Sequence, residues 1–291
     1  ILQGSTIVVE NGIITAIGNR ELEEEGGGIT VIDAQQTTIT PGFFDSHVHV
    51  TIGDYGHRQH AAGFLESELH GGVTTVISAG EPHMPGRPKD PAGTKAMAML
   101  VSKSFYNAPP AGMKVHGGAL ILEKGLVEED FKELKEQGVW LVGEIGLGSV
   151  KQPEEAAMMV EWAHKYGFKV QMHTGGTSIP GSSTVTAEDV IITKPDVVSH
   201  LNGGPTAVSP KEIEKIMDEE IIKAKKDGPN TEYYEGSFVV ISDPKSGGIL
   251  ATSGRKATKV DENYKTYDYT PGILTSPVVV GSIIKGASQI V

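Results

Sequence analysis

Hydrophobic and polar positions follow one repeating pattern from residue 41 to about residue 220. Short apolar runs rich in Val and Ile take turns with longer stretches in which apolar residues recur every three or four positions. The first pattern is typical of buried strands and the second of amphipathic helices. Strand–helix units of about 30 residues predict a parallel sheet covered by helices, either a (β/α)8 barrel like that of TIM or an open doubly wound sheet.

The pattern contains six strand–helix units. The predicted strands are Phe43–Val50, Val73–Ala79, Met113–Leu122, Val139–Ile145, Phe168–His173 and Val197–Leu201. The predicted helices are His57–His70, Thr94–Tyr106, Glu128–Gln137, Glu154–Tyr166, Thr186–Thr193 and Pro210–Glu220. We assign residues 41–272 to this α/β barrel domain and leave open whether eight strands close it.

The chain on the N-terminal side of the barrel has a different pattern. Ser5–Val9 and Ile13–Gly18 are apolar-rich runs joined by Glu10-Asn11-Gly12, which is a tight-turn signal. Thr30–Asp33 and Thr37–Thr40 predict two further short strands. Four short strands with little apolar bulk indicate that residues 1–40 form a small sheet, which is an annex to the barrel and not an independent domain.

The pattern weakens after Glu220. Ser237–Ser242 predicts one clear strand, but Gly254–Tyr269 has neither a helical nor a strand period. Ile273–Val291 returns to β-like runs, and we leave open whether it joins the annex of residues 1–40. The chain beyond Glu220 has room for about two more β/α units, but not for two units and a second sheet.

The amino-acid composition excludes several classes of protein. The chain has 291 residues, with 38% hydrophobic and 21% charged residues, and a mean hydropathy of −0.15. These values indicate a folded globular protein, and no apolar run is long enough to span a membrane. The net charge of −12 argues against nucleic acid or an anionic membrane as a partner. The chain opens without a basic segment followed by an apolar one, so we expect no secretory signal and a cytoplasmic location.

The residue types limit the chemistry of any metal site. The chain contains 10 His and no Cys. The lack of Cys excludes disulfides, zinc ribbons, iron–sulfur clusters and thiol nucleophiles. Metal ligands would therefore be His, Asp or Glu.

The strongest local signal is His47-Val48-His49 at the end of the first predicted barrel strand. Residues i and i+2 of a strand point to the same face, so the two imidazoles project together and can chelate one divalent ion. A His-x-His pair alone is weak evidence, because two packed or solvent-facing histidines give the same pattern.

Three further residues close later strands. Glu144, His173 and His200 each end a predicted strand, at intervals of 29 and 27 residues that match one β/α unit each. All of these side chains therefore reach the C-terminal rim of the barrel, where barrel enzymes build their active sites. Four His and one carboxylate suit zinc, iron, manganese or nickel better than calcium or magnesium. Two His pairs flanking Glu144 suggest two ions bridged by that carboxylate, which is an arrangement for hydrolysis.

Several motifs resemble the amidohydrolase superfamily. Pro41-Gly42-Phe43-Phe44-Asp45-Ser46-His47-Val48-His49 resembles the opening of its barrel, and Val8–Gly18 resembles its N-terminal β-sandwich. The longer motifs are similar to those of the branch that contains the enamidases, over residues 5 to about 218. They are Leu69–Thr75, His83–Asp90, Val142–Gly148, Gln171–Gly176 and Ser199–Pro205.

The resemblance implies a hydrolase that opens a cyclic enamide, 6-oxo-1,4,5,6-tetrahydronicotinate, giving 2-formylglutarate and ammonia. It implies a binuclear iron–zinc centre and a homotetramer. His47 and His49 would hold one metal, His173 and His200 the other, and Glu144 would bridge them.

Two further assignments concern residues other than the metal ligands: a catalytic acid and the cations that bind substrate. The family has a catalytic Asp after its eighth strand, and Asp243 is the best match, although it follows His200 by only 43 residues. An ordinary Asp-Pro turn explains Asp243 equally well. Arg87 and Lys89 lie in the loop after the second barrel strand, where the carboxylate of a substrate needs a cation.

Two alternatives stay open. Another cyclic amidohydrolase, similar to dihydroorotase or hydantoinase, would use the same metal ligands on a different ring. A relative that retains metal but lacks the proton shuttle would serve as a binding or assembly subunit. The chain from about Glu219 onward does not resemble the family, which puts the closure of the barrel and its activity in question.

Overall fold

The computed structural model describes residues 5–18, 28–35, 37–50, 61–84, 86–107, 109–201, 206–227, 236–242, 246 and 248–273. The chain divides into two compact units, Ile1–Pro41 and Gly42–Val291. In the first unit, β1 (Thr6–Glu10) and β2 (Ile13–Gly18) form an antiparallel hairpin. Asn11 and Gly12 make its turn with φ of 52° and 78°, the left-handed conformation that a tight hairpin requires.

The two further strands predicted for the first unit are wrong. Residues 30–33 and 37–40 have no strand structure. Their apolar side chains find no partner to cover them within this unit, since Ile32 is 85% exposed and Ile39 61%. A short apolar run forms a stable strand only when a neighbour supplies hydrogen bonds and a buried face.

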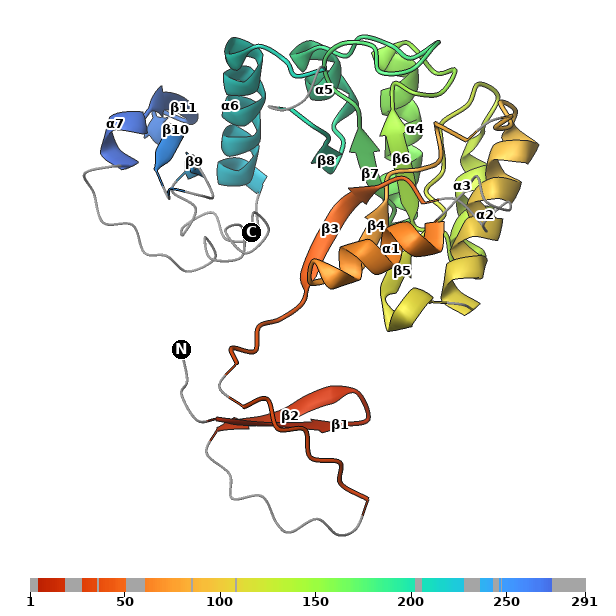
Figure 1. Ribbon diagram of the computed structural model, residues 1–291. Coiled ribbons are helices and arrows are strands. Elements are labelled where there is room, and N and C mark those ends of the chain that lie inside the picture. Colours follow the sequence, from red (N-terminus) through yellow and green to blue (C-terminus); the bar gives the residue numbers. More distant parts are fainter. Residues whose placement is uncertain are drawn as a thin grey trace. The chain divides into compact units, whose positions relative to one another are not determined.

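The second unit contains parallel strands connected by helices, as the sequence predicts (Figure 1). The strands are β3 (Phe43–Val48), β4 (Val73–Ser78), β5 (Lys114–His116), β6 (Leu141–Ile145), β7 (Lys169–Met172) and β8 (Val197–Val198). The helices are α1 (Ala61–His70), α2 (Pro91–Asn107), α3 (Glu128–Glu136), α4 (Pro153–Lys165), α5 (Ala187–Thr193) and α6 (Pro210–Asp227), with a 3-10 turn η2 (Pro110–Gly112) before β5.

The strands pair in chain order. Parallel ladders join β3 to β4 to β5, and β6 to β7 to β8. An isolated parallel bridge between Leu120 and Val142 connects the two groups. The predicted strand Met113–Leu122 is therefore interrupted. Gly118 interrupts it with φ of 81°, at a point where a Cβ atom would lie 2.1 Å from the Ala98 carbonyl oxygen.

Local sequence explains where the helices begin. Pro153 opens α4, at a position where its missing N–H costs nothing. Thr186 and Asp189 form a capping box at the start of α5, in which each side chain accepts a hydrogen bond from the other residue's backbone N–H. The proline and the capping box each fix the direction in which the chain enters its helix after a loop at the rim.

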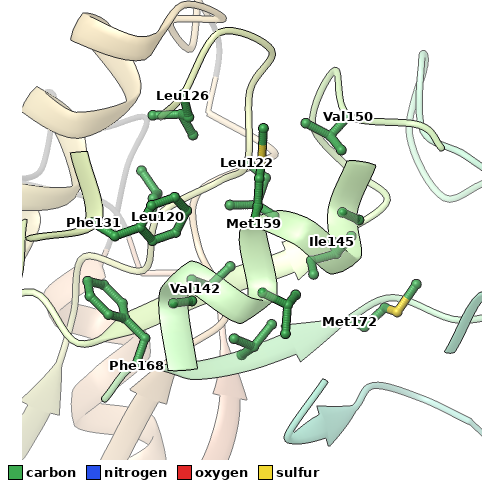
Figure 2. Packing of buried hydrophobic residues seen from close by; sticks show 14 of the residues in the cluster. Leu120, Leu122, Leu126, Phe131, Val142, Ile145, Val150, Met159, Phe168 and Met172 are labelled. Carbon is green, nitrogen blue, oxygen red and sulfur yellow. The ribbon is translucent and has the colours of Figure 1, made fainter. Parts of the chain in front are cut away.

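The main hydrophobic core lies between the strands and helices α2 to α6. Figure 2 shows its part around β6, β7, α3 and α4. Phe131 and Phe168 are fully buried there and meet edge to face, with ring centroids 5.9 Å apart. Each buried aromatic side chain contributes roughly 2–3 kcal/mol through burial, and the pair about 1 kcal/mol more. This packing makes the part of the sheet that carries the rim residues rigid.

The chain after α6 forms an antiparallel sheet. Its strands are β9 (Gly236–Ser242), β10 (Ile249–Val260) and β11 (Asn263–Asp268), with β10 in the middle, followed by the short helix α7 (Thr270–Ile273). The long hairpin within residues 254–269 was missed, because its polar residues occupy both faces and leave no apolar alternation. Residues 274–291, for which we predicted β-like runs, lie outside the described residues. No helix in the described ranges is long and apolar enough to cross a membrane.

Candidate metal centre

The structure brings together the five residues that the strand ends predict as metal ligands. His47 lies near the end of β3 and His49 follows it, while Glu144 lies near the end of β6. His173 directly follows β7, and His200 follows β8 by two residues. Parallel strands place all these positions at one edge, so the side chains converge from four strands.

Glu144 occupies the middle of this group. Its Oε1 atom lies 2.9 Å from His200 Nε2 and 3.5 Å from His47 Nε2. Its Oε2 atom lies 3.4 Å from His49 Nε2. His47, Glu144 and His200 each offer a donor atom within 4.8 Å of the other two. Oε1 of the carboxylate thus faces a histidine from β3 and the histidine after β8, while Oε2 faces His49, so both oxygens are directed at imidazole nitrogens.

His173 joins the group through His200. Its Nδ1 atom lies 3.3 Å from His200 Nε2, and the two ring centroids are 4.7 Å apart. The backbone of His200 has φ of 37°, a strained left-handed conformation for a residue with a side chain. Such strain is typical of functional positions that the surrounding structure holds in place.

The second nitrogen of each histidine contacts an oxygen outside the group. His47 Nδ1 lies 3.2 Å from Gln171 Oε1 and 3.0 Å from Ser199 Oγ. His49 Nδ1 lies 2.8 Å from the Gly80 carbonyl oxygen. Donation to an acceptor oxygen fixes the tautomer and leaves the other ring nitrogen free to bind metal.

The other two histidines are held in the same way. His200 Nδ1 lies 3.0 Å from Thr206 Oγ1, and His173 Nε2 lies 2.7 Å from the Gly176 carbonyl oxygen. The loop that supplies Thr206 passes very close to Gly175, where a Cβ atom would lie 1.3 Å from the Thr206 carbonyl oxygen. Only glycine permits this approach.

The protonation states of His47, His173 and Glu144 suit a metal centre. Burial lowers the pKa of His47 and also that of His173, which favours neutral imidazoles. Burial alone would raise the pKa of Glu144, but the hydrogen bond from His49 and the nearby histidine charges outweigh it and hold the value at about 2. Burial likewise opposes charge on His49, yet its bonds to Glu144 and Gly80 raise its pKa. Near neutral pH, Glu144 is a carboxylate among imidazole donors, and this set fits zinc or iron.

The two predicted substrate contacts lie in different environments. Arg87 is buried, and its Nη1 atom donates to Glu123 Oε1 at 2.5 Å and to the Pro88 carbonyl oxygen at 3.1 Å. Lys89 is exposed. The guanidinium of Arg87 is therefore already paired, whereas Lys89 is accessible. Asp243, the predicted catalytic residue, lies outside the described residues.

The sequence reasoning missed residues that contact the ligands. Gln171 precedes His173 by two positions on β7, so strand alternation could have placed it on the ligand face. Ser199 and Thr206 carry no pattern that would have revealed them. His83 lies in the loop after β4 with its ring 4.8 Å from that of His49.

Glu81, in the same loop as His83, is an unusual buried acid. It is 2% exposed, and neither carboxylate oxygen has a hydrogen-bond partner among the described residues. Burial raises the pKa of Glu81 from 4.5 to about 9, and the nearby Ser78 side chain offsets this only in part. Glu81 is therefore a neutral carboxylic acid at physiological pH.

The chain is similar to several known proteins. Residues 38–195 match the Amidohydrolase family. The chain is 69% identical over 219 residues to enamidase of Eubacterium barkeri, an alignment that covers 75% of this chain and 57% of that enzyme. The crystal structure of enamidase superposes with a TM-score of 0.69 at 70% identity over the same shares of the two chains.

Two more distant relatives are also similar. The chain is 30% identical over 162 residues to dihydroorotase of Geobacillus sp. (strain WCH70), covering 55% of this chain and 35% of that enzyme. It is 38% identical over 78 residues to penicillin-binding protein 2A of Bacillus subtilis (strain 168), covering 27% of this chain and 11% of that protein. The chain thus spans little more than half the length of enamidase and smaller parts of the other two.

Proposed function

Because the chain belongs to the amidohydrolase family, we propose that it is a metal-dependent hydrolase that opens the ring of a cyclic amide. The substrate we propose is 6-oxo-1,4,5,6-tetrahydronicotinate. One water cleaves the lactam C–N bond, and a second releases ammonia from the resulting enamine to leave 2-formylglutarate. The identity to enamidase supports this choice of ring over other cyclic amides.

The observation that carries the proposal is the position of Glu144 among four histidines whose outer nitrogens are all tied to oxygen acceptors. We assign His47 and His49 to one ion, His173 and His200 to the other, and Glu144 to the bridge between them. Bound divalent ions would supply hydroxide at neutral pH and polarise the lactam carbonyl. We propose iron and zinc as the two ions.

The protein's own groups hold this centre ready for metal. Gln171 and Gly80 engage the Nδ1 atoms of His47 and His49, so the Nε2 atoms that face Glu144 are the ones that would bind metal. Burial of Glu144 excludes bulk water from the bridging carboxylate. The substrate carboxylate would meet a cation of the loop after β4, for which Arg87 and Lys89 are our candidates. Of these two, Lys89 is the accessible one.

The remaining assignments rest on likeness alone. We propose a cytoplasmic homotetramer in which the β1–β2 hairpin of residues 1–40 contributes to an N-terminal β-sandwich annex, with a small-molecule cyclic amide as the ligand besides metal.

A substrate panel tests the reaction. Metal-loaded protein is incubated with 6-oxo-1,4,5,6-tetrahydronicotinate, dihydroorotate and a hydantoin, and ring opening and ammonia release are followed. We expect turnover of the first compound, and its loss in Glu144→Gln. Turnover of dihydroorotate or the hydantoin alone would favour the dihydroorotase-like alternative. Metal binding without turnover of any ring would favour a non-catalytic relative.

A further inference from the structure

Two of the sequence similarities together account for the length of the chain. The stretch similar to enamidase spans 219 residues and the stretch similar to penicillin-binding protein 2A spans 78, which together equal the length of the chain within a few residues. The amidohydrolase match lies at residues 38–195, and the enamidase-like motifs end near residue 218. We place the second stretch in the C-terminal quarter, because the enamidase-like stretch accounts for the rest of the chain.

The strand topology changes at the same place. Strands β3 to β8 pair in parallel with their neighbours in the chain, whereas β9, β10 and β11 form a separate antiparallel sheet. Among the described residues, no strand of this sheet pairs with β3 or β8, the two edges that further barrel strands would extend. The C-terminal sheet thus does not continue the barrel pattern.

Helix α6 contains the point of change. In its first half, Ile216 is buried in the main barrel core, and Lys215 forms an ion pair with Glu188 of α5. In its second half, Ile221 is 1% exposed but belongs to neither hydrophobic cluster of the described barrel. The helix contacts all three strands of the antiparallel sheet.

Asp218 lies between the two halves and faces the C-terminal sheet. Its carboxylate accepts two hydrogen bonds from Arg255 of β10, from Nε at 2.8 Å and from Nη2 at 2.6 Å. A bidentate pair of this kind fixes both distance and orientation. The first half of α6 therefore packs on the barrel, while the pair from Asp218 anchors the C-terminal sheet to the same helix.

We infer that the chain joins two parts of different ancestry within α6, near residue 219, and that β9–β11 are a separate module related to penicillin-binding protein 2A. In the sequence, Asp243 directly follows β9. We therefore assign Asp243 no role as a metal ligand or as the proton shuttle at the rim. All protein ligands of the metal centre come from the barrel part of the chain.

Native-state hydrogen exchange of the full chain tests the module boundary. Phe131→Ala weakens the barrel core, and should lower protection of β6 and β7 amides by roughly a hundredfold or more while leaving β10 unchanged. Phe238→Ala is the reciprocal variant, because Phe238 packs on Tyr269 within the C-terminal sheet. It should lower protection in β10 and β11 only. If either variant lowers protection equally in both parts, the chain is one cooperative unit and the inference is wrong.

Metal titration tests the ligand set. Added zinc should protect amides beside His47, Glu144 and His200 and leave β9 and β10 unaffected. Asp243→Asn should keep the zinc stoichiometry of the parent, like the control Asp261→Asn in the turn between β10 and β11. Loss of zinc in Asp243→Asn alone would overturn the inference. A failure to bind any zinc would contradict the proposed function, and the exchange experiment would still decide the boundary.

Discussion

Gln171 of β7 accepts a hydrogen bond from the Nδ1 atom of His47 on β3, over a distance of 3.2 Å. The same amide donates through Nε2 to the Ser78 carbonyl oxygen at the end of β4. One buried side chain thus ties together strands that are far apart in the sequence, and it sets which nitrogen of His47 faces Glu144. The curvature that brings these strands together is a condition for the metal centre.

Replacement of Gln171 by Leu should weaken metal binding without unfolding the protein. The substitution removes one of the two oxygens that contact His47 Nδ1 and leaves Ser199 Oγ as the other. Losses of this kind typically lower metal affinity about 10–100-fold. Gln171→Glu keeps an acceptor oxygen and should restore much of the affinity. Gln152→Ala is the matched control, because that exposed side chain caps nothing. Zinc affinity is measured by competition with a chromophoric chelator, and equal affinity of all four proteins would contradict the positioning role.

Replacement of Glu81 by Gln should stabilise the protein at neutral and alkaline pH. The pKa of Glu81 is about 9 when folded against 4.5 when unfolded, so the folded state binds the extra proton between these values. Stability from this group is present in full below pH 4.5 and falls as pH rises toward 9. At pH 7 the free energy of unfolding is lower by about 3 kcal/mol at most than it is below pH 4.5, because of this group.

The measurement is denaturant unfolding of the parent and Glu81→Gln from pH 5 to 9. The variant should have the flatter profile. Parallel profiles would mean that Glu81 is charged in the folded protein or that an unseen cation pairs with it.

Substitutions of Arg87 and of Lys89 should distinguish a role in stabilising the fold from a role in binding the substrate. Arg87→Met leaves Glu123 buried with its ion pair broken, which should cost about 3–5 kcal/mol of stability. Lys89→Met should leave stability unchanged and raise KM, because an exposed cation contributes to binding and not to folding. Thermal unfolding and steady-state kinetics give the two readouts. A normal stability of Arg87→Met together with a raised KM would instead assign the substrate carboxylate to Arg87.

The sequence predicts the barrel part of this fold well, for a physical reason. Residues such as Val142 and Val170 lie in strands buried on both faces, and such strands appear as continuous apolar runs that end at the rim. Glu144 and His173 interrupt the apolar pattern at those ends, so their convergence could be foreseen. Strand alternation equally predicts that Gln171 lies on the ligand face. Its role could not be predicted, because a polar residue within a buried strand indicates no particular chemistry until its hydrogen-bond partner is known.

Other features depend on contacts that no local pattern encodes. Ile32 and Ile39 have strand-like surroundings in the sequence, yet no strand pairs with them among the described residues of the first unit. The β10–β11 hairpin has polar residues on both faces, and its stability comes from pairing with β9 and from packing against α6. Thr206 reaches His200 only because Gly175 lets the two loops meet.

The metal content of the purified protein tests the central claim most directly. Elemental analysis of the parent should find about two ions of iron and zinc per chain, since Glu144 and four histidines provide ligands for two. His173→Ala should lose one of them, while His164→Ala, which removes an exposed histidine paired with Asp196, should keep both. Parent protein without bound metal, or a His173→Ala variant with unchanged content, would contradict the account.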